Sequence, residues 1–380
     1  ASGDSRMHTA LRRLRAGNPD AVMVLTGCFA QAFPKEAAAL PEADLVIGTQ
    51  DRDRLPQLVQ QFLMGKRAPM QHIPAYTGTE AFACLPHHLP ADRTRAFLKI
   101  QDGCNCFCSY CIIPYARGPV RSLPKAEAVA QTEHLRQEGY RELVFTGIEI
   151  SSWGRDLKNG ESLIDLLEAV SAAAGGMRLR LGSLEPRTIT EDFCRRASKL
   201  PNLCPHFHLS LQSGCDETLR RMNRKYDTAR FYQSVTLLRA YFDRPAVTTD
   251  LICGFPGETE EEFARTLAFI EKCGFAAMHI FPYSIRPGTK AAAMEQLSAA
   301  VKERRAARAA EVASQMHRAY LEGCVGQVYP VLFEQEKDGY YTGHTPNYCE
   351  TGVRGEDLHN RVLNVKITGT DGDMLMGELT

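Results

Sequence analysis

The sequence has no long apolar run and no excess of one charge sign. No stretch approaches the roughly 18 consecutive apolar residues of a membrane-spanning helix, so a membrane protein is not expected. Lys and Arg total 45, as do Asp and Glu, so the whole chain has no field that attracts nucleic acid, and any such site has to be a local patch. Hydrophobic residues make up 44% and charged residues 24%, which excludes a disordered chain and a coiled coil.

The beginning of the chain also lacks two common features. It starts at Ala1 rather than Met, and no charged segment followed by an apolar one marks a signal peptide. A helical pattern begins at once, with Met7, Leu11 and Leu14 on one face. We therefore expect a fragment that lacks its true beginning, with a processed N-terminus as the alternative. The expected location is the cytoplasm.

Cysteine is the residue whose use is unusual. The chain has 13 Cys, an odd number that is too low for a small disulfide scaffold, and four of them lie within residues 104–111. This pattern indicates a reducing compartment and a metal or cluster site.

The length of 380 residues allows two or three domains at about 150 residues each. Residues 1–68 alternate helix and strand patterns, which is typical of part of a small α/β layer domain. Residues 69–94 lack periodicity and contain four Pro, so they are predicted to be a linker. Residues 95–322 carry a regular βα pattern. Residues 323–380 carry short apolar strands with Gly and Asn turns, which predicts a small all-β barrel.

The βα pattern predicts a parallel sheet. Its expected strands are 97–101, 142–146, 178–182, 206–211, 246–252 and 276–281. Its expected helices are 124–138, 161–174, 190–200, 215–241, 258–273 and 298–321. Strands joined by crossover helices predict a complete or partial barrel with active groups at the carboxyl ends of the strands. In the C-terminal region the expected strands are Val328–Phe333, Tyr340–Thr342 and Val362–Thr368.

Cys104, Cys108 and Cys111 have the spacing C-x3-C-x2-C in a loop expected after the first barrel strand. This spacing places three thiolates round one centre. Because a four-iron cluster needs four ligands to be closed, one iron would keep an open site for a small molecule. A structural zinc site with Cys106 as fourth ligand is the alternative, although four ligands so close in sequence would be cramped. The third interpretation is a group of buried thiols without a metal.

With Tyr110 before its last Cys, this motif resembles the radical S-adenosylmethionine (SAM) superfamily. The resemblance implies a partial (βα)6 barrel and a [4Fe–4S] cluster on the three cysteines, whose open iron chelates the amino and carboxyl groups of SAM. It also implies that one electron from the cluster cleaves SAM to give a 5′-deoxyadenosyl radical. Cys106 departs from the Asn more usual at its position, and we expect it not to be a ligand.

Polar residues recur where the barrel strands are expected to end. Gly147 and Glu149 resemble the superfamily's Gly-Gly-Glu segment, which contacts the methionine amino group, with Ile148 in place of one Gly. For each such residue the alternative is a helix cap or a satisfied loop group, but recurrence at strand ends favours a functional role. The predicted cofactor contacts are Tyr110, Gly147, Glu149, Ser183, Glu185, Gln212 and Asp250. No residue is assigned as catalytic.

Further segments resemble the methylthiotransferase branch of this superfamily, namely residues 99–124, 209–214, 221–224 and 281–289. The resemblance implies that residues 1–68 are the C-terminal part of a domain holding a second, auxiliary [4Fe–4S] cluster on three cysteines. It also implies that residues 323–380 are a TRAM-like RNA-binding domain. Cys28 matches the third auxiliary cysteine, but no cysteine precedes it, which agrees with a missing segment. Cys84 is a poor substitute, and without the resemblance Cys28 would be a small core residue.

The branch has three substrates: isopentenylated adenosine in tRNA, N6-threonylcarbamoyladenosine in tRNA, and an aspartate of a ribosomal protein. The string from Ile112 to Ser122 resembles the threonylcarbamoyladenosine group most closely, which implies 2-methylthiolation of this base next to the anticodon. Arg117 and Arg121 are the expected contacts to RNA phosphate or the threonyl carboxylate, with a solvated or ion-paired Arg as the alternative. Basic runs at 220–225 and 302–308 are further candidates for RNA contact.

The resemblance implies two uses of SAM. One molecule donates a methyl group to a sulfide of the auxiliary cluster, and the radical from the other abstracts hydrogen from C2 of the adenine. The expected partners are the tRNA anticodon loop, SAM and an electron donor, with no membrane and no DNA. The alternatives left open are the ribosomal-protein aspartate enzyme, the isopentenyladenosine enzyme and, from another class, a non-catalytic zinc-stabilised RNA-binding protein.

Overall fold

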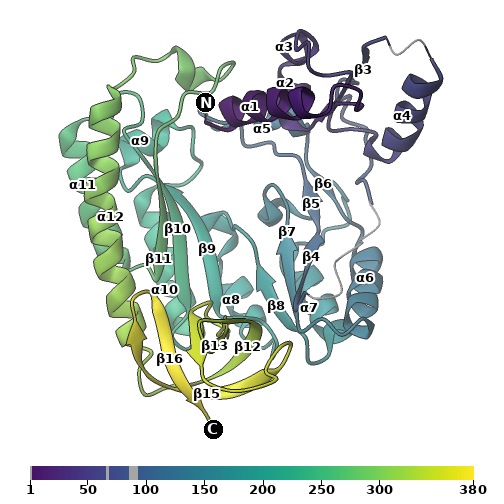
Figure 1. Cartoon of the computed structure of the whole chain (residues 1–380). Coiled ribbons are helices and arrows are strands. Elements are labelled where there is room, and N and C mark those ends of the chain that lie inside the picture. The colour runs from purple at the N-terminus through teal and green to yellow at the C-terminus, as the bar shows by residue number, and fades with distance from the viewer. Residues whose placement is uncertain (1, 66–67, 85–92) are drawn as a thin grey trace. The chain divides into compact units, whose positions relative to one another are not determined.

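The computed structural model describes residues 2–65, 68–84 and 93–380 (Figure 1). The chain divides into two compact units. The first comprises Ala1–Pro86, Asp102–Arg121 and Ser284–Ala293, and the second comprises the remaining residues. The first unit is therefore discontinuous in sequence, because two later segments complete it.

The first unit contains a parallel sheet with helices on both faces. Its strands follow the order β1 (Val24–Thr26), β2 (Leu45–Ile47) and β3 (Met70–His72). Its helices are α1 (Ser2–Gly17), α2 (Cys28–Ala32), α3 (Pro34–Ala38), α4 (Leu55–Met64) and α5 (Ile113–Arg117).

Alternation along β2 explains the two layers of helices. Val46 faces a core that includes Leu11 of α1, whereas Leu45 and Ile47 face a core that includes Phe62 of α4. β3 lies within the segment predicted to be a linker. It is only three residues long and partly exposed, which is too short for a periodicity to show.

The second unit contains six parallel strands in the described part of the chain. They are β4 (Arg95–Lys99), β7 (Glu142–Thr146), β8 (Arg178–Leu181), β9 (His206–Gln212), β10 (Ala246–Cys253) and β11 (Ala277–Pro282). They pair in the orders β4-β7-β8 and β9-β10-β11, and a parallel bridge between Leu184 and Leu209 joins the two halves. The predicted partial (βα)6 barrel is confirmed. Two short strands, β5 (Gln101–Asp102) and β6 (Arg121–Ser122), pair with each other at the base of the cysteine loop.

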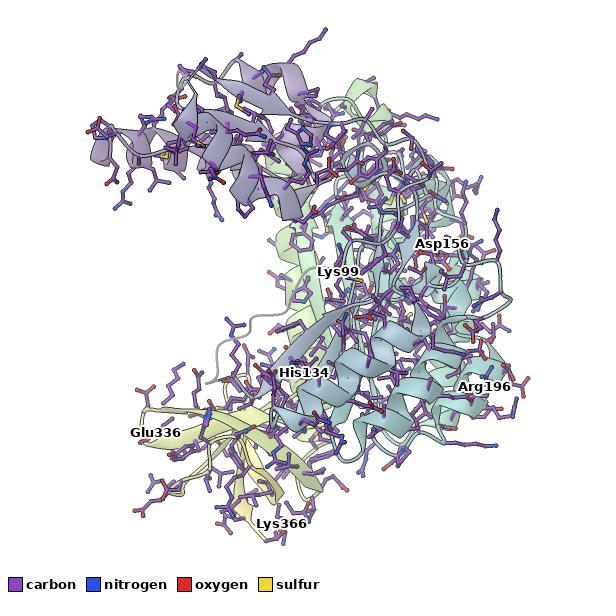
Figure 2. The ribbon with its side chains drawn as sticks, turned by 90° about the vertical axis from the view of Figure 1, so that its right-hand side faces the viewer. Lys99, His134, Asp156, Arg196, Glu336 and Lys366 are labelled. Atoms are coloured by element: carbon purple, nitrogen blue, oxygen red, sulfur yellow. The ribbon has the colours of Figure 1, made fainter. Side chains whose placement is uncertain are left out.

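Helices connect these strands. They are α6 (Lys125–Gln137), α7 (Leu163–Ala174), α8 (Glu191–Ala197), α9 (Asp216–Arg221), α10 (Thr228–Tyr241), α11 (Glu260–Cys273) and α12 (Ala299–Glu322). Arg196 of α8 lies on the outer side (Figure 2). It bonds Asp165 at 2.7 Å and Glu168 at 2.5 Å, both on α7. Such exposed pairs contribute at most about 1 kcal/mol each.

The segment 215–241, which the sequence predicted to be one helix, forms two helices, α9 and α10. Asn223 adopts a left-handed conformation with φ of +59°, which ends the first helix. Asp227 begins the second, because its carboxylate accepts a hydrogen bond of 2.8 Å from the N–H of Arg230. The prediction was wrong because the apolar pattern continues across this break.

The C-terminal residues form a closed barrel in the order β12-β13-β14-β16-β15. The predicted small all-β barrel is confirmed. Its strands are β12 (Val328–Lys337), β13 (Tyr340–His344), β14 (Glu350–Val353), β15 (Val362–Asp371) and β16 (Met374–Leu379), of which β14 and β16 were not predicted. Phe333, Val365 and Leu375 are among its core residues.

A buried ionic network lies at the amino ends of the large-barrel strands. Glu142, the first residue of β7, accepts two hydrogen bonds of 2.7 and 3.0 Å from Arg180 and lies 2.7 Å from Arg178. Arg180 also donates to the carbonyl oxygen of Pro346 at 2.9 Å, and Arg178 donates to that of Pro330 at 3.1 Å. The arginines therefore join the large barrel to the small one.

An aromatic stack continues this junction. Tyr348 of the small barrel stacks on His206 and on His344, with ring centroids 4.9 and 4.7 Å away. The guanidinium of Arg180 lies 4.6 Å from the centroid of the same ring. Tyr348 therefore packs against these side chains while 42% of its surface stays exposed.

Glu142 generates a prediction about stability. Burial alone would raise its pKa, but the attraction of Arg180 and Arg178 lowers the pKa to about 2. Glu142→Gln should lower the free energy of unfolding near neutral pH by about 3 kcal/mol, because it leaves buried arginines without their counter-charge. Urea unfolding measures this loss.

The pH dependence has a definite sign. A lowered carboxyl pKa stabilises the fold above the unfolded-state value of 4.5, and this stabilisation is lost as the pH falls towards 2. The difference between wild type and Glu142→Gln should therefore narrow over that window. Glu311→Gln, at an exposed position on α12, is the control and should match wild type. Equal stability of wild type and Glu142→Gln near neutral pH would contradict the prediction.

Candidate active site

The cysteine loop lies within the first unit and is folded onto itself. Gly103 has a φ of +75°, and a Cβ there would lie 1.8 Å from a backbone carbonyl oxygen, so this position requires Gly. The N–H of Cys104 donates to the carbonyl oxygen of Gly118, and the N–H of Cys111 donates to that of Cys108, both at 3.0 Å. Cys104 is buried, whereas Cys108 and Cys111 are half-buried.

The donor set of this loop fits the predicted iron–sulfur cluster. Cys104, Cys108 and Cys111 are not in disulfides, and thiolates are soft ligands suited to iron. The N–H of Cys106 donates to Sγ of Cys104 at 3.4 Å, the type of hydrogen bond that ligand sulfurs of such clusters accept. Tyr110 lies half-buried in the same loop.

Cys28, the first residue of α2, contacts the end of this loop. Nε of Arg117, on α5, donates to Sγ of Cys28 at 3.2 Å, and Nη1 of the same residue lies 3.6 Å from Oδ2 of Asp102. One side chain therefore connects Cys28 with the segment that carries the other three thiols. The sequence did not predict this contact, because the partners lie 89 positions apart and no local pattern signals it.

Arg121 is also engaged inside the first unit. It donates to the carbonyl oxygens of Arg117 and Pro119 at 3.0 and 2.9 Å, and it lies 3.7 Å from Oδ2 of Asp102. Its guanidinium lies 4.9 Å from the centroid of the Tyr76 ring. The contacts of both arginines match the ion-paired alternative, and their contact with RNA stays a prediction.

In the second unit, Gly147 and Glu149 follow β7 and pack on Gln101. A Cβ at Gly147 would lie 2.8 Å from the carbonyl oxygen of Gln101, whose Oε1 accepts the N–H of Glu149 at 2.8 Å. Burial raises the pKa of Glu149 against the attraction of Arg155. Oε1 of Glu149 has no hydrogen-bond partner among the described residues. A buried acceptor of this kind fits the predicted contact with an amino group.

Ser183 and Glu185 differ in how they are engaged. Glu185 begins a short 3-10 helix (Pro186–Thr188), and its carboxylate accepts hydrogen bonds from N–H and Nε–H of Arg187 at 3.0 and 2.8 Å. This is the helix-cap alternative. Ser183 is exposed. The cofactor contacts predicted for these two residues stay predictions.

Gln212 and Asp250 lie on the neighbouring strands β9 and β10. Gln212, the last residue of β9, has a φ of +68°, a conformation that most side chains avoid. Oδ2 of Asp250 lies 3.3 Å from Nε2 of His208. The predictions missed this histidine, although its alternation with His206 along a strand pattern placed both on one face.

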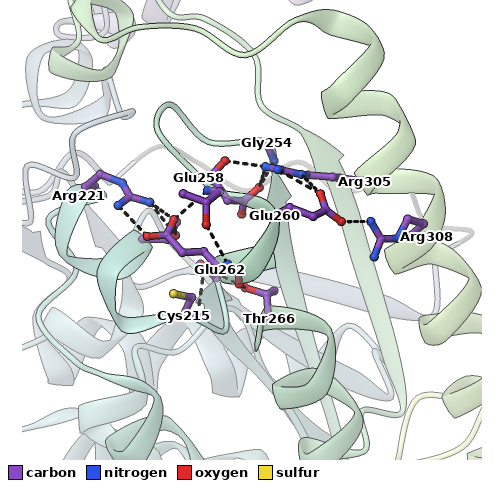
Figure 3. Close-up of polar contacts among 12 residues, drawn as sticks. Cys215, Arg221, Gly254, Glu258, Glu260, Glu262, Thr266, Arg305 and Arg308 are labelled. Atoms are coloured by element: carbon purple, nitrogen blue, oxygen red, sulfur yellow. Dashed lines mark hydrogen bonds and ion pairs between the residues drawn. The ribbon is translucent and has the colours of Figure 1, made fainter. Parts of the chain in front are cut away.

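Two of the four basic residues in the run at 302–308, Arg305 and Arg308, pair with acidic partners. Arg305 is buried and bonds the buried Glu258 at 2.7 Å, while Arg308 pairs with Glu260 (Figure 3). Glu258 also accepts the N–H of Gly254 at 2.9 Å, which fixes the loop after β10 to α12. Arg305 therefore positions a loop rather than presenting a charge to RNA.

No helix in the described segments combines the length and the apolar composition that crossing a membrane requires.

Known proteins resemble this chain in sequence. The sequence pattern of the radical SAM superfamily matches residues 98–270, so that, with the strands and the cysteine loop, the chain has the features of a radical SAM enzyme. The chain is 37% identical over 373 residues to "Threonylcarbamoyladenosine tRNA methylthiotransferase MtaB" of Bacillus subtilis, covering 96% of this chain and 82% of that protein. It is 34% identical to "tRNA-2-methylthio-N(6)-dimethylallyladenosine synthase" of Symbiobacterium thermophilum, covering 97% and 81%. The chain belongs to the radical SAM methylthiotransferase family.

A solved structure is similar in fold. The radical S-adenosylmethionine methyltransferase TsrM from Kitasatospora setae has a TM-score of 0.57 and 14% sequence identity, over 88% of this chain and 64% of that chain. At this identity the likeness concerns the fold alone.

The cysteine loop generates a second prediction. Anaerobically reconstituted protein should bind about four irons with equal labile sulfide, and Cys104→Ala, Cys108→Ala and Cys111→Ala should each lose most of them. Cys106→Ala is the matched control and should keep its iron. Iron and sulfide analysis, with electron paramagnetic resonance before and after SAM is added, measures this. Zinc without labile sulfide, or loss of iron in Cys106→Ala alone, would contradict a [4Fe–4S] cluster on Cys104, Cys108 and Cys111.

Proposed function

We propose that this protein attaches a methylthio group to C2 of N6-threonylcarbamoyladenosine next to the anticodon of tRNA. One observation carries the proposal: the 37% identity, over 96% of the chain, to an enzyme named for this substrate. The C-x3-C-x2-C loop supports the radical route. That route suits the substrate, because the C–H at C2 of an adenine has no acidic proton for a general base to remove.

The residues of the chain have separate roles in this proposal. Cys104, Cys108 and Cys111 would hold a [4Fe–4S] cluster, which when bound supplies the electron that cleaves SAM. Glu149 would accept a hydrogen bond from the SAM amino group. The remaining contacts to SAM are proposed for Tyr110, Gly147, Ser183, Glu185 and Gln212, whereas Asp250, which the sequence also predicted as a SAM contact, is left for the substrate.

An auxiliary [4Fe–4S] cluster is the proposed source of sulfur. Cys28 would be one ligand, and Arg117 donates to its sulfur at 3.2 Å, a contact of the type that tunes such clusters. No cysteine precedes Cys28 in the chain, so this sequence contains no match for the other two auxiliary ligands.

RNA binding is proposed for the C-terminal barrel, as a TRAM-like domain over residues 323–380. A single-stranded anticodon base is less costly to splay out than a paired one, so it can enter a site at the barrel mouth. The other proposed boundaries are 1–68, 69–94 and 95–322, and the proposed setting is the cytoplasm with an electron donor.

Nucleoside analysis tests the function. In cells that lack their own methylthiotransferases and express the gene of this protein, tRNA should gain 2-methylthio-N6-threonylcarbamoyladenosine, and Cys104→Ala should abolish it. Mass spectrometry of digested tRNA separates this product from 2-methylthio-isopentenyladenosine. Formation of only the isopentenyl product, or methylthiolation of a ribosomal-protein aspartate instead, would replace the proposed substrate.

Cys28 gives a separate prediction. The reconstituted 380-residue chain should hold about four irons and cleave SAM, and Cys28→Ala should change neither result, because one thiol does not hold a cluster. Iron analysis and 5′-deoxyadenosine release measure this. About eight irons in the wild type would mean that Cys28 finds further ligands within this chain.

A further inference from the structure

The inner face of the large-barrel sheet is accessible along part of its length. Along β9 and β10 every second residue from His208 and Thr248 onward is half-buried, whereas the alternating residues, such as Leu209 and Leu251, are fully buried. The buried residues face the helices, so the half-buried ones face the interior of the barrel. The ionic network of Glu142 occupies the opposite, amino end of the strands.

Polar groups gather on this accessible face. Nδ1 of His208 lies 3.1 Å from Oγ1 of Thr248, and Nε2 lies 3.3 Å from Oδ2 of Asp250. These two contacts occupy both nitrogens of His208 and hold the carboxylate of Asp250. His208 is therefore a positioning residue rather than a free hydrogen-bonding group.

His279 stands beside this pair on β11. It is the register partner of Asp250, so the two backbones lie about 4.8 Å apart on adjacent parallel strands. The centroid of its ring lies 6.0 Å from that of His208. Its side chain is exposed, and the described contacts give it no hydrogen bond or ion pair. Asp250 keeps 29% of its side chain exposed.

The imidazole of His279, a hydrogen-bond donor, thus lies beside the carboxylate of Asp250, an acceptor. An imidazole N–H donates to a carboxylate, while the carboxylate of Asp250 accepts from a hydroxyl or an amide N–H. An apolar group in the same place would leave His279 and Asp250 without partners, and such sites reject analogues that lack the matching polar groups. Phe281 follows on the same face of β11 with 52% of its surface exposed, an apolar surface on which a flat ring can lie.

We propose that His279 and Asp250 form the subsite for the polar N6-substituent of the adenine and so determine specificity for threonylcarbamoyl over isopentenyl. His279 donates to the threonyl carboxylate, and Asp250, held by His208, accepts from the hydroxyl or the carbamoyl N–H. This assignment rests on the proposed function and adds to it the residues that choose between the two tRNA substrates.

Binding of anticodon stem-loop RNAs tests the subsite. Three RNAs differ only in the base next to the anticodon: threonylcarbamoyladenosine, isopentenyladenosine and adenosine. Reconstituted wild-type protein should bind the first about 10-fold more tightly than the other two, and His279→Leu should abolish this margin without weakening the others, since a hydrogen bond to a charged group is worth about a factor of ten or more. Fluorescence anisotropy at one fixed salt concentration gives the affinities.

Two further variants complete the design. His279→Gln keeps a donor and should retain part of the margin. His134→Leu changes an exposed histidine on α6 and should behave as wild type (Figure 2). Because His279 is exposed, its substitution should leave the melting temperature unchanged, which excludes unfolding as the cause.

The outcomes separate the two proposals. A wild-type preference that His279→Leu retains would overturn the subsite and leave the function standing. Equal weakening of all three RNAs would also overturn it, because it would show a general contact. A wild type that does not prefer the threonylcarbamoyl RNA would overturn the proposed function and the subsite with it.

Discussion

The second unit depends on how one buried carboxylate is neutralised. An ionised Glu142 in a dry interior is tolerated only with full compensation, which Arg180 and Arg178 provide. The arginines have more N–H groups than Glu142 accepts, and carbonyl oxygens of the small barrel, such as that of Pro346, accept several of the others. The small barrel therefore contributes hydrogen-bond acceptors to the buried ion pairs of the large barrel. Because this network closes the amino ends of the strands, the candidate cofactor contacts lie at the carboxyl ends.

Much of the fold could be predicted from sequence because its signals are local. The βα pattern predicted the six strands of the second unit within two residues at each end. The helix expected at 258–273 begins within two residues of α11, whose first turn is closed by a capping box of Thr259 and Glu262. The features that were missed depend on other parts of the chain or on single residues. Asn223 ends a helix by one left-handed residue, and the parallel pairing of β14 with β16 joins segments distant in sequence, such as Thr351 and Leu375.

The candidate site divides in the same way. Cys104, Cys108 and Cys111 could be found because their spacing lies within one loop. The contact between Arg117 and Cys28, and the pairing of Asp250 with His208, could not be found, because each joins segments whose proximity only the folded chain creates. Glu185 has a local contact that the sequence allowed as an alternative: its carboxylate caps the following turn, and its predicted contact with the cofactor stays a prediction.

The discontinuous first unit has a consequence for modularity. Thr49 donates a hydrogen bond of 2.8 Å to the carbonyl oxygen of Ala116, next to the residue whose guanidinium meets Cys28. An N-terminal fragment made by cutting the chain between residues 69 and 94 would lack Ala116 and Arg117, the partners of Thr49 and Cys28. The N-terminal part therefore cannot be exchanged by itself, and a chimera that replaces it also has to replace residues 102–121.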